Sequence, residues 1–276
     1  MTCGSDPRGN ITDEIVGGNT VRHNVWDLQN RLRQCTNNGV TSTFTYGADG
    51  LRRSMTVGTN PTVHYALDGQ SVAQEGHLDN GDFVADTTYL NGARGPECKI
   101  DASGNTVWYI FDGLGSVVAE ADDSGTVTAT RAYDVYGIPR GGTSSTKHGF
   151  VGSLGHTTEP STGGLIYMRA RWMDPLTGRF ISEDPAGDGN NWYTYCRNNP
   201  VNHTDPSGEN ALILICGGGL AIALLEAVAA TILLYITVAA VIGGIEMASQ
   251  YYQRSHERML GTMHGREKHW IYTIKK

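Results

Sequence analysis

Residues 108–137 read WYIFDGLGSVVAEADDSGTVTATRAYDVYG and contain the pattern that decides the fold. Two phrases in this stretch, FDG at 111–113 and YDVYG at 133–137, combine an aromatic residue, an acid and a glycine. The segment at 126–133 alternates and is rich in β-branched residues, as strands are. An aspartate that hydrogen-bonds amides two residues ahead, with glycine or asparagine in the left-handed position, closes tight turns. The stretch therefore predicts β-hairpins.

The same phrase recurs through the first half of the chain. Further copies lie at 6–10 (DPRGN), 26–32 (WDLQNRL), 46–51 (YGADGL) and 65–69 (YALDG). Neighbouring copies are roughly 20 residues apart, the spacing of hairpins that stack on one another. A second set of turn sequences, at 101–107 and 122–127, would close the opposite ends of these hairpins. The first half of the chain is therefore predicted to be mainly β.

Composition supports this fold class and excludes several functions. The 276 residues include 36 glycines, which suit many tight turns, and the net charge of −7 makes nucleic acid an improbable partner. The five cysteines are scattered and include no Cys-x-x-Cys pair, so neither a zinc site nor a disulfide framework is indicated. The first residues show no basic and apolar pattern of a signal peptide.

The repeat resembles the YD repeat of the Rhs family, which is found in bacterial polymorphic toxins, in the C subunits of insecticidal toxin complexes and in animal teneurins. The resemblance covers roughly residues 5–208, is especially close at 108–137 and is strongest at 164–208. It implies that stacked hairpins coil into a hollow β-shell. So few repeats cannot close a shell alone, so we expect either a fragment or a chain that completes its sheet with the rest of an Rhs shell or another chain.

Residues 164–208, GLIYMRARWMDPLTGRFISEDPAGDGNNWYTYCRNNPVNHTDPSG, resemble the Rhs-associated core domain that closes the shell. Alternation predicts one extended strand over 165–173, with Tyr167 and Trp172 on opposite faces. Asp-Pro turns are predicted after it at 174–178, 183–187 and 205–208. We name residues 148–209, which contain this stretch, the core segment.

The resemblance implies an aspartic autoprotease that cuts its own chain and frees a C-terminal toxin inside the shell. Such chemistry needs two carboxyl groups that share a proton. Carried onto this sequence, the dyad is Asp174 with Glu159, where family members that cleave have aspartate, and Arg169 and Arg171 support it. The cut is expected at Gly208, Glu209 and Asn210, where Glu209 replaces the family's leucine. Alternatively, Glu159 and Asp174 cap turns and pair with Arg169 or Arg171.

Other chemistry has little support in the sequence. The nine histidines show no metal-ligand spacing, and neither a phosphate-binding glycine loop nor a Gly-x-Ser-x-Gly elbow occurs. No metal and no cofactor are therefore predicted. His148, His156 and His203 are expected to be turn or surface residues.

The C-terminal quarter differs in character. From 211 to 245 the only charged residue is Glu226, whereas 251–276 is locally basic. We predict a short helical hydrophobic region over 210–248, which either spans a membrane or is sequestered as a pre-toxin segment, and a basic tail over 249–276. With a β-hairpin shell segment over 1–147 and the core segment over 148–209, the chain has four predicted parts.

The first functional hypothesis is the C-terminal part of a toxin-delivery protein that encapsulates or releases an effector, with an immunity protein as a partner of that effector. The second is a YD-repeat surface protein, anchored in a membrane through 211–245, that binds glycans or neighbouring cells. The third is a degenerate remnant without activity. The first two predict a location that is membrane-associated or secreted to the cell surface.

Overall fold

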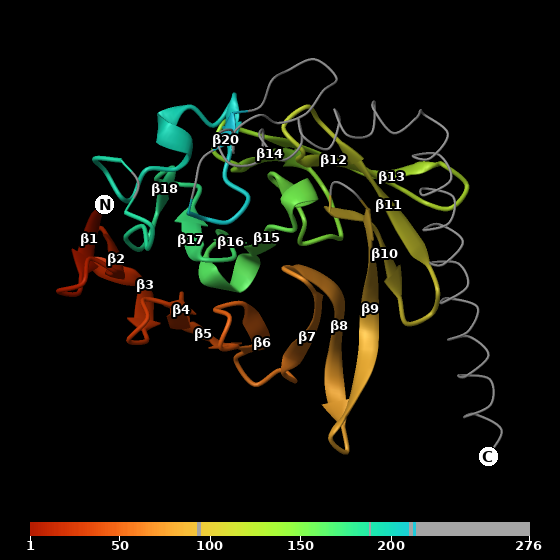
Figure 1. The fold of residues 1–276 in the computed structure, drawn as a ribbon, viewed down its shortest axis with the longest axis horizontal. Coiled ribbons are helices and arrows are strands. Elements are labelled where there is room, and N and C mark those ends of the chain that lie inside the picture. Colours follow the sequence, from red (N-terminus) through yellow and green to blue (C-terminus); the bar gives the residue numbers. More distant parts are fainter. Residues whose placement is uncertain (93–94, 188, 210–211, 214–276) are drawn as a thin grey trace, which may run out of the picture. The chain divides into compact units, whose positions relative to one another are not determined.

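The computed structural model describes residues 1–92, 95–187, 189–209 and 212–213. In this part of the chain, fourteen strands that are consecutive in sequence form one antiparallel sheet, the large sheet, in the order β1 to β14 (Figure 1). Its strands are β1 (Thr2–Ser5), β2 (Ile11–Val16), β3 (Asn19–Trp26), β4 (Leu32–Asn37), β5 (Val40–Tyr46), β6 (Arg52–Val57), β7 (Val63–Asp68), β8 (Ser71–Asp79), β9 (Asp82–Gly92), β10 (Gly95–Asp101), β11 (Thr106–Phe111), β12 (Val117–Ala121), β13 (Val127–Tyr133) and β14 (Pro139–Gly142). The prediction of a mainly β protein made of stacked hairpins is confirmed.

The repeated phrase forms one kind of turn. Asp112 Oδ1 accepts hydrogen bonds from the amides of Leu114 and Ser116, at 2.9 and 2.8 Å. Gly115, at φ +89°, donates its amide to the Asp112 carbonyl. The same pattern of bonds recurs at Asp27, Asp101, Asp122 and Asp134. The residue in the left-handed conformation therefore lies three positions after the aspartate, where glycine or asparagine is least strained.

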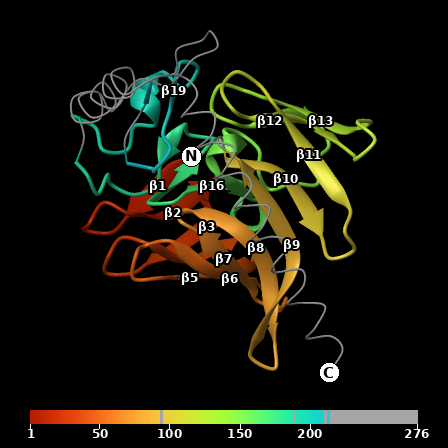
Figure 2. The same ribbon diagram turned by 45° about the vertical axis from the view of Figure 1, so that its right-hand side comes forward.

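The core segment forms a second, four-stranded sheet. It consists of β15 (Thr157–Glu159), β16 (Leu165–Met168), β17 (Arg171–Asp174) and β18 (Arg179–Phe180). The core segment also contains three short 3₁₀ helices, η1 (Gly152–Leu154), η2 (Pro160–Thr162) and η3 (Cys196–Asn198). Its last strand, β19 (His203–Thr204), pairs with β20 (Leu212–Ile213), which follows the core segment. Figures 1 and 2 show the large sheet curving around β15, β16 and β17.

Two apolar clusters hold the core segment. One combines residues of the large sheet with residues of the core segment: Leu32, Cys35, Phe44, Met55, Tyr65, Leu165, Tyr167, Trp172 and Ile181. The other is built within the core segment: Phe150, Val151, Ile166, Met168, Met173, Phe180, Tyr195 and Cys196. Because the first cluster draws on both sheets, the predicted shell and core segments share one hydrophobic core.

The prediction of one continuous strand over 165–173 is wrong. The chain reverses at Arg169, which adopts φ +61°, and Met168 pairs with Arg171 across the resulting hairpin. Tyr167 and Trp172 are therefore cross-strand partners on one face, with ring centroids 5.1 Å apart. A turn made of arginine and alanine carries none of the glycine, asparagine or proline signals from which a hairpin is predicted.

The predicted C-terminal parts lie almost wholly outside the described residues. Of the helical hydrophobic region over 210–248, only residues 212–213 are described, and they form β20, which pairs with β19. The basic tail over 249–276 is not described at all. Within the described residues, no helix has the length and apolar character that a membrane crossing requires.

Candidate functional site

The first carboxyl of the predicted dyad, Glu159, forms a buried ion pair with the large sheet. Its Oε1 lies 2.8 Å from Arg52 Nη2 and 3.1 Å from the hydroxyl of Thr157. The Arg52 guanidinium lies 4.6 Å from the ring centroids of both Tyr65 and Tyr167. Burial raises the pKa of Glu159, but the charges of Arg52 and Lys147 outweigh burial and hold it below its ordinary value. The ion pair with Arg52 therefore stabilises the ionised form of Glu159.

The second carboxyl, Asp174, pairs with a different arginine. Arg22 of β3 contacts both Asp174 and Glu14, and all three side chains are buried. Asp174 Oδ1 also accepts the amide of Leu176 at 2.9 Å, which closes the turn after β17. Asp174 is therefore a turn cap, as one of the alternatives predicts, but its ion-pair partner is Arg22 rather than Arg169 or Arg171.

The structure does not bring the two predicted dyad carboxyls together. Glu159 lies in β15 and Asp174 in β17, with β16 between them. Neighbouring strands are 4.7–4.9 Å apart, so their backbones are about 10 Å from each other. Two carboxyls share a proton only in direct contact.

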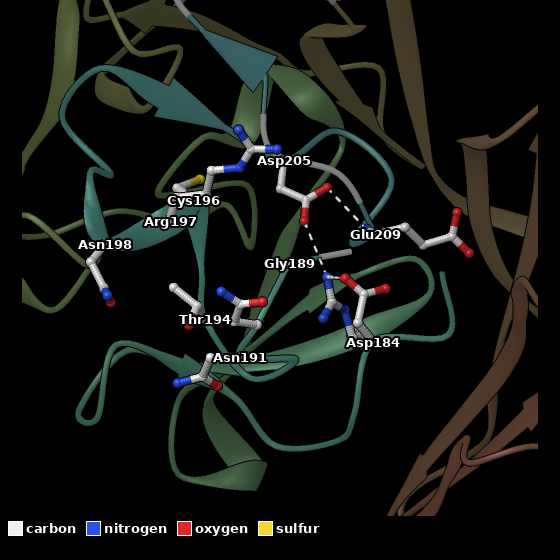
Figure 3. A pocket seen from close by; sticks show the side chains of 11 residues that line it. Asp184, Gly189, Asn191, Thr194, Cys196, Arg197, Asn198, Asp205 and Glu209 are labelled. Atoms are coloured by element: carbon white, nitrogen blue, oxygen red, sulfur yellow. Dashed lines mark hydrogen bonds and ion pairs between the residues drawn. The ribbon is translucent and has the colours of Figure 1, made fainter. Parts of the chain in front are cut away.

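Another pair of carboxyls meets at Arg171, which is 3% exposed. Arg171 Nη2 lies 3.2 Å from Asp184 and 3.5 Å from Asp205 (Figure 3). The guanidinium carbon is 3.6 Å from the ring centroid of Phe180, and Nη1 donates to the carbonyl of Trp192 at 3.0 Å. Burial lowers the pKa of Arg171, while the charges of the two aspartates act in the opposite direction. One fixed cation thus faces two carboxyls.

The predicted cleavage positions lie at this arginine. Asp205 Oδ1 accepts the amides of Gly208 and Glu209 at 2.8 and 3.1 Å. Arg171 Nε donates to the carbonyl of Gly208. The peptide group between Gly208 and Glu209 is therefore held on both sides, its carbonyl by Arg171 and its N–H by Asp205. Asn210 lies outside the described residues.

A pocket of about 320 Å³ adjoins this peptide group. Its lining includes the polar side chains of Arg171, Asp184, Asn191, Thr194, Asp205 and Glu209 (Figure 3). A site with this much room and several polar groups can hold water. Glu209 is partly exposed at the pocket rather than buried, so its charge remains solvated.

The prediction of surface or turn positions for two histidines is wrong. His148 and His156 are each 1% exposed, and burial lowers the pKa of both to about 3. His148 packs against the rings of Tyr89 and Tyr109. The third, His203, is partly exposed. Among the described residues no three histidine, cysteine or acidic side chains are grouped as metal ligands would be.

No family model matches the chain, but comparison with known proteins finds relatives. The chain is 32% identical over 207 residues to the tRNA3(Ser)-specific nuclease WapA of Bacillus spizizenii, a match that covers 70% of this chain. It is 48% identical over 52 residues, 18% of this chain, to toxin subunit YenC2 of Yersinia entomophaga. The chain belongs to the Rhs/YD-repeat family.

The share of each Rhs relative that is matched is small. The chain spans 9% of the length of WapA and 5% of YenC2. Among solved structures, the fold is similar to part of the TcdB2-TccC3-Cdc42 crystal structure, with a TM-score of 0.55 and 21% identity over 70% of this chain and 10% of that one. At this identity the likeness concerns the fold.

Sequence reasoning missed Asp184 and Asp205 as functional candidates of this Rhs chain. The sequence predicts both only as caps of Asp-Pro turns. The available signal is the repetition of one phrase, Asp-Pro-Ala-Gly at 184–187 and Asp-Pro-Ser-Gly at 205–208, in a window that also contains the buried Arg171. A turn aspartate and a catalytic aspartate look the same in sequence until a shared partner brings two of them together.

Proposed function

We propose that the described residues form the end of an Rhs-type toxin-delivery shell, and that its core segment cuts the chain beside Glu209. The proposal rests on one observation: Asp184 and Asp205 contact the same nitrogen of Arg171, at the peptide group that comes directly after Gly208. The curved large sheet, filled on its inner side by residues 148–209, supports the shell assignment. On this proposal residues 1–147 are shell and 148–209 are its plug.

The reaction is hydrolysis of one peptide bond. One aspartate, as carboxylate, takes a proton from a water molecule in the pocket, and the resulting hydroxide attacks the carbonyl carbon. The other aspartate, as carboxylic acid, donates its proton to the departing nitrogen, so the C–N bond breaks to a carboxyl group and an amine. One water is consumed, and the proton taken by the first aspartate restores the pair.

Arg171 has two tasks in this scheme. Its Nε–H donates to the carbonyl of Gly208, the kind of contact that stabilises negative charge developing on a carbonyl oxygen. Its Nη2 holds both aspartates in place. If the bond that breaks is Gly208–Glu209, the Arg171 Nε–H polarises the carbonyl that is attacked. If it is the next bond along the chain, the one that the resemblance implies, the same hydrogen bond positions the segment before the cut.

Mass spectrometry of the purified chain tests the proposal. We expect an N-terminal product that ends at Gly208 or Glu209. Asp184→Asn and Asp205→Asn should each leave the chain intact, because an amide can neither accept the water proton nor supply one. Asp49→Asn, at an exposed ion pair with Arg53, is the control and should leave the cut unchanged. Glu159→Gln tests the other predicted dyad, and the cut should persist in any Glu159→Gln protein that stays folded.

Two outcomes would overturn the assignment. If the wild-type chain stays intact at every pH from 4 to 8, the core segment is not a protease, and the degenerate remnant becomes the better description. If cleavage occurs and is lost only in Glu159→Gln and Asp174→Asn, the chemistry belongs to those carboxyls and not to the pair at Arg171.

The same proposal has consequences for the cargo and the partners. Relatives are named as tRNA nucleases and as a double-stranded DNA deaminase toxin, and these activities are theirs. By analogy, the part of the chain beyond Glu209 is released as cargo, and its location is extracellular or inside a target cell. Its partners are other shell subunits and an immunity protein that neutralises the cargo.

The apolar composition of 211–245 favours a second candidate, a surface protein anchored in a membrane that binds glycans. Flotation of the chain with lipid vesicles, compared with a chain ending at Glu209, tests the anchor. Equal recovery of both in the aqueous fraction would remove this candidate.

A further inference from the structure

Four consecutive carbonyl groups just before the proposed cut are all held from outside their own segment. Those of Asp205, Pro206, Ser207 and Gly208 accept hydrogen bonds from, in order, His156 Nε2 at 2.9 Å, Arg169 Nη1, the amide of Ala170 at 3.1 Å and Arg171 Nε. Three of the four donors are consecutive residues of the β16–β17 hairpin. We name this set of donors the carbonyl cradle.

The close approach of Gly208 to the hairpin backbone also fixes which residue can occupy this position. Gly208 adopts φ +77°, and a methyl group built on it would lie 2.1 Å from the carbonyl oxygen of Met168. Only glycine fits so close to the hairpin backbone. A slip of the segment by one residue would move another residue into this space and displace each carbonyl by up to about 3.8 Å, the spacing of consecutive Cα atoms, which breaks all four hydrogen bonds.

Arg169 connects the cradle to the large sheet. Its Nη1 donates to the carbonyl of Pro206, and its Nε donates at 3.3 Å to the carbonyl of Gln70, in the turn between β7 and β8. Arg169 also occupies the left-handed position that makes the hairpin turn back. The same side chain therefore touches the shell and the segment that is cut.

We propose that Arg169 is a positioning residue, which sets the register of residues 205–208 in the carbonyl cradle and ties that register to the presence of the large sheet. The inference deepens the proposed self-cleavage and rests on it for its consequence. Because all four carbonyls belong to the N-terminal product, the cradle keeps holding this product after the cut, with its new carboxylate close to Arg171.

The first test is the position of the cut in the full chain. Arg169→Gln should slow cleavage about tenfold or more, the loss expected for a charge-assisted hydrogen bond, and should spread the product ends over several residues. Arg169→Lys, which keeps a donor and the charge, should restore part of the rate. Arg53→Gln, the control at an exposed arginine paired with Asp49, should match the wild type. An unchanged rate with one unchanged product end in Arg169→Gln overturns the proposal.

The second test does not depend on cleavage. In the Asp184→Asn chain, hydrogen exchange of the 205–209 peptide reports the amides of Gly208 and Glu209, which donate to Asp205. Adding Arg169→Gln should speed this exchange about tenfold, while Arg53→Gln should not. Equal exchange in the two chains overturns the positioning role. If Arg169→Gln speeds the exchange but the wild-type chain is never cut, the positioning role of Arg169 holds and the proposed self-cleavage is wrong.

Discussion

Two buried histidines should make the fold sensitive to mild acid. His148 and His156 are each 1% exposed, and the Nδ1 atom of each has no hydrogen-bond partner among the described residues. His156 Nε2 donates to the carbonyl of Asp205, so any further proton would have to sit on the unpartnered Nδ1. Burial accordingly lowers the pKa of both rings from 6.5 to about 3.

Linkage between proton binding and folding gives the sign and size of the effect. Above pH 6.5 both rings are neutral in the folded and unfolded chains, and they do not affect the pH dependence. As the pH falls from 6.5 towards about 3, the two histidines bind protons in the unfolded chain but not in the folded chain, so the free energy of unfolding decreases. At pH 5.0, 1.5 units below 6.5, the loss is about 2 kcal/mol for each histidine.

Urea unfolding monitored by tryptophan fluorescence, at pH 7.5 and 5.0, measures this loss. The uncut Asp184→Asn chain serves as reference, and at pH 5.0 most carboxyl groups are still ionised. We expect His148→Leu to remove about half of the acid-induced loss, because leucine fills the space without a titratable nitrogen. His77→Leu is the control, since His77 is 44% exposed and paired with Asp86. The reasoning is refuted if His148→Leu loses as much stability between the two pH values as the reference does.

Two further substitutions probe the packing of the core segment. Glu159→Gln should lower the free energy of unfolding by about 3–5 kcal/mol in the same urea assay, because it leaves Arg52 buried without its counter-charge. Asp49→Asn, at an exposed ion pair, should leave that free energy unchanged. Equal effects of the two substitutions would contradict this reasoning. Gly208→Ala should abolish the cut, as seen by mass spectrometry, because its methyl group meets the Met168 carbonyl, and normal cleavage in this variant would show that the segment is not held as described.

The local parts of the fold could be predicted from sequence, because their physics is local. The turn at Asp112 depends on amides two and four residues ahead, and on a glycine three residues ahead, all within one phrase. The hairpin at Arg169 could not be predicted, because its left-handed residue is an arginine whose carbonyl partner is 37 residues further on. Its conformation is fixed by tertiary contacts.

The site shows the same limit. The partner of Glu159 lies 107 residues away in sequence and that of Asp174 lies 152 residues away, so the sequence alone does not reveal which arginine each carboxyl meets. The family resemblance led to the window that contains Arg171, the arginine at which the proposed site is centred. It did not identify the aspartates at that arginine, because both occur in phrases that also form ordinary turns.

The buried charges divide into two groups with different tasks. At the boundary between the sheets, Arg22 and Arg52 come from the large sheet and pair with Asp174 and Glu159 of the core segment. Arg22 also pairs with Glu14 of β2. Lys147, just before the core segment, pairs in the opposite sense with Glu75 of the large sheet. A buried charge without its partner is strongly destabilising, so the core segment can bury these carboxylates only where the large sheet supplies the arginines.

Arg171, Asp184 and Asp205, in contrast, all belong to the core segment, so the chemical group is complete within it. Arg169 is the side chain of the cradle that both reaches the large sheet and touches the segment to be cut. On the proposed cleavage, the core segment supplies all three charged groups of the reaction but depends on the large sheet to be buried and to be held in register. A chain that fails to assemble its sheet should consequently fail to cut itself, which would protect an unfinished shell from losing its cargo.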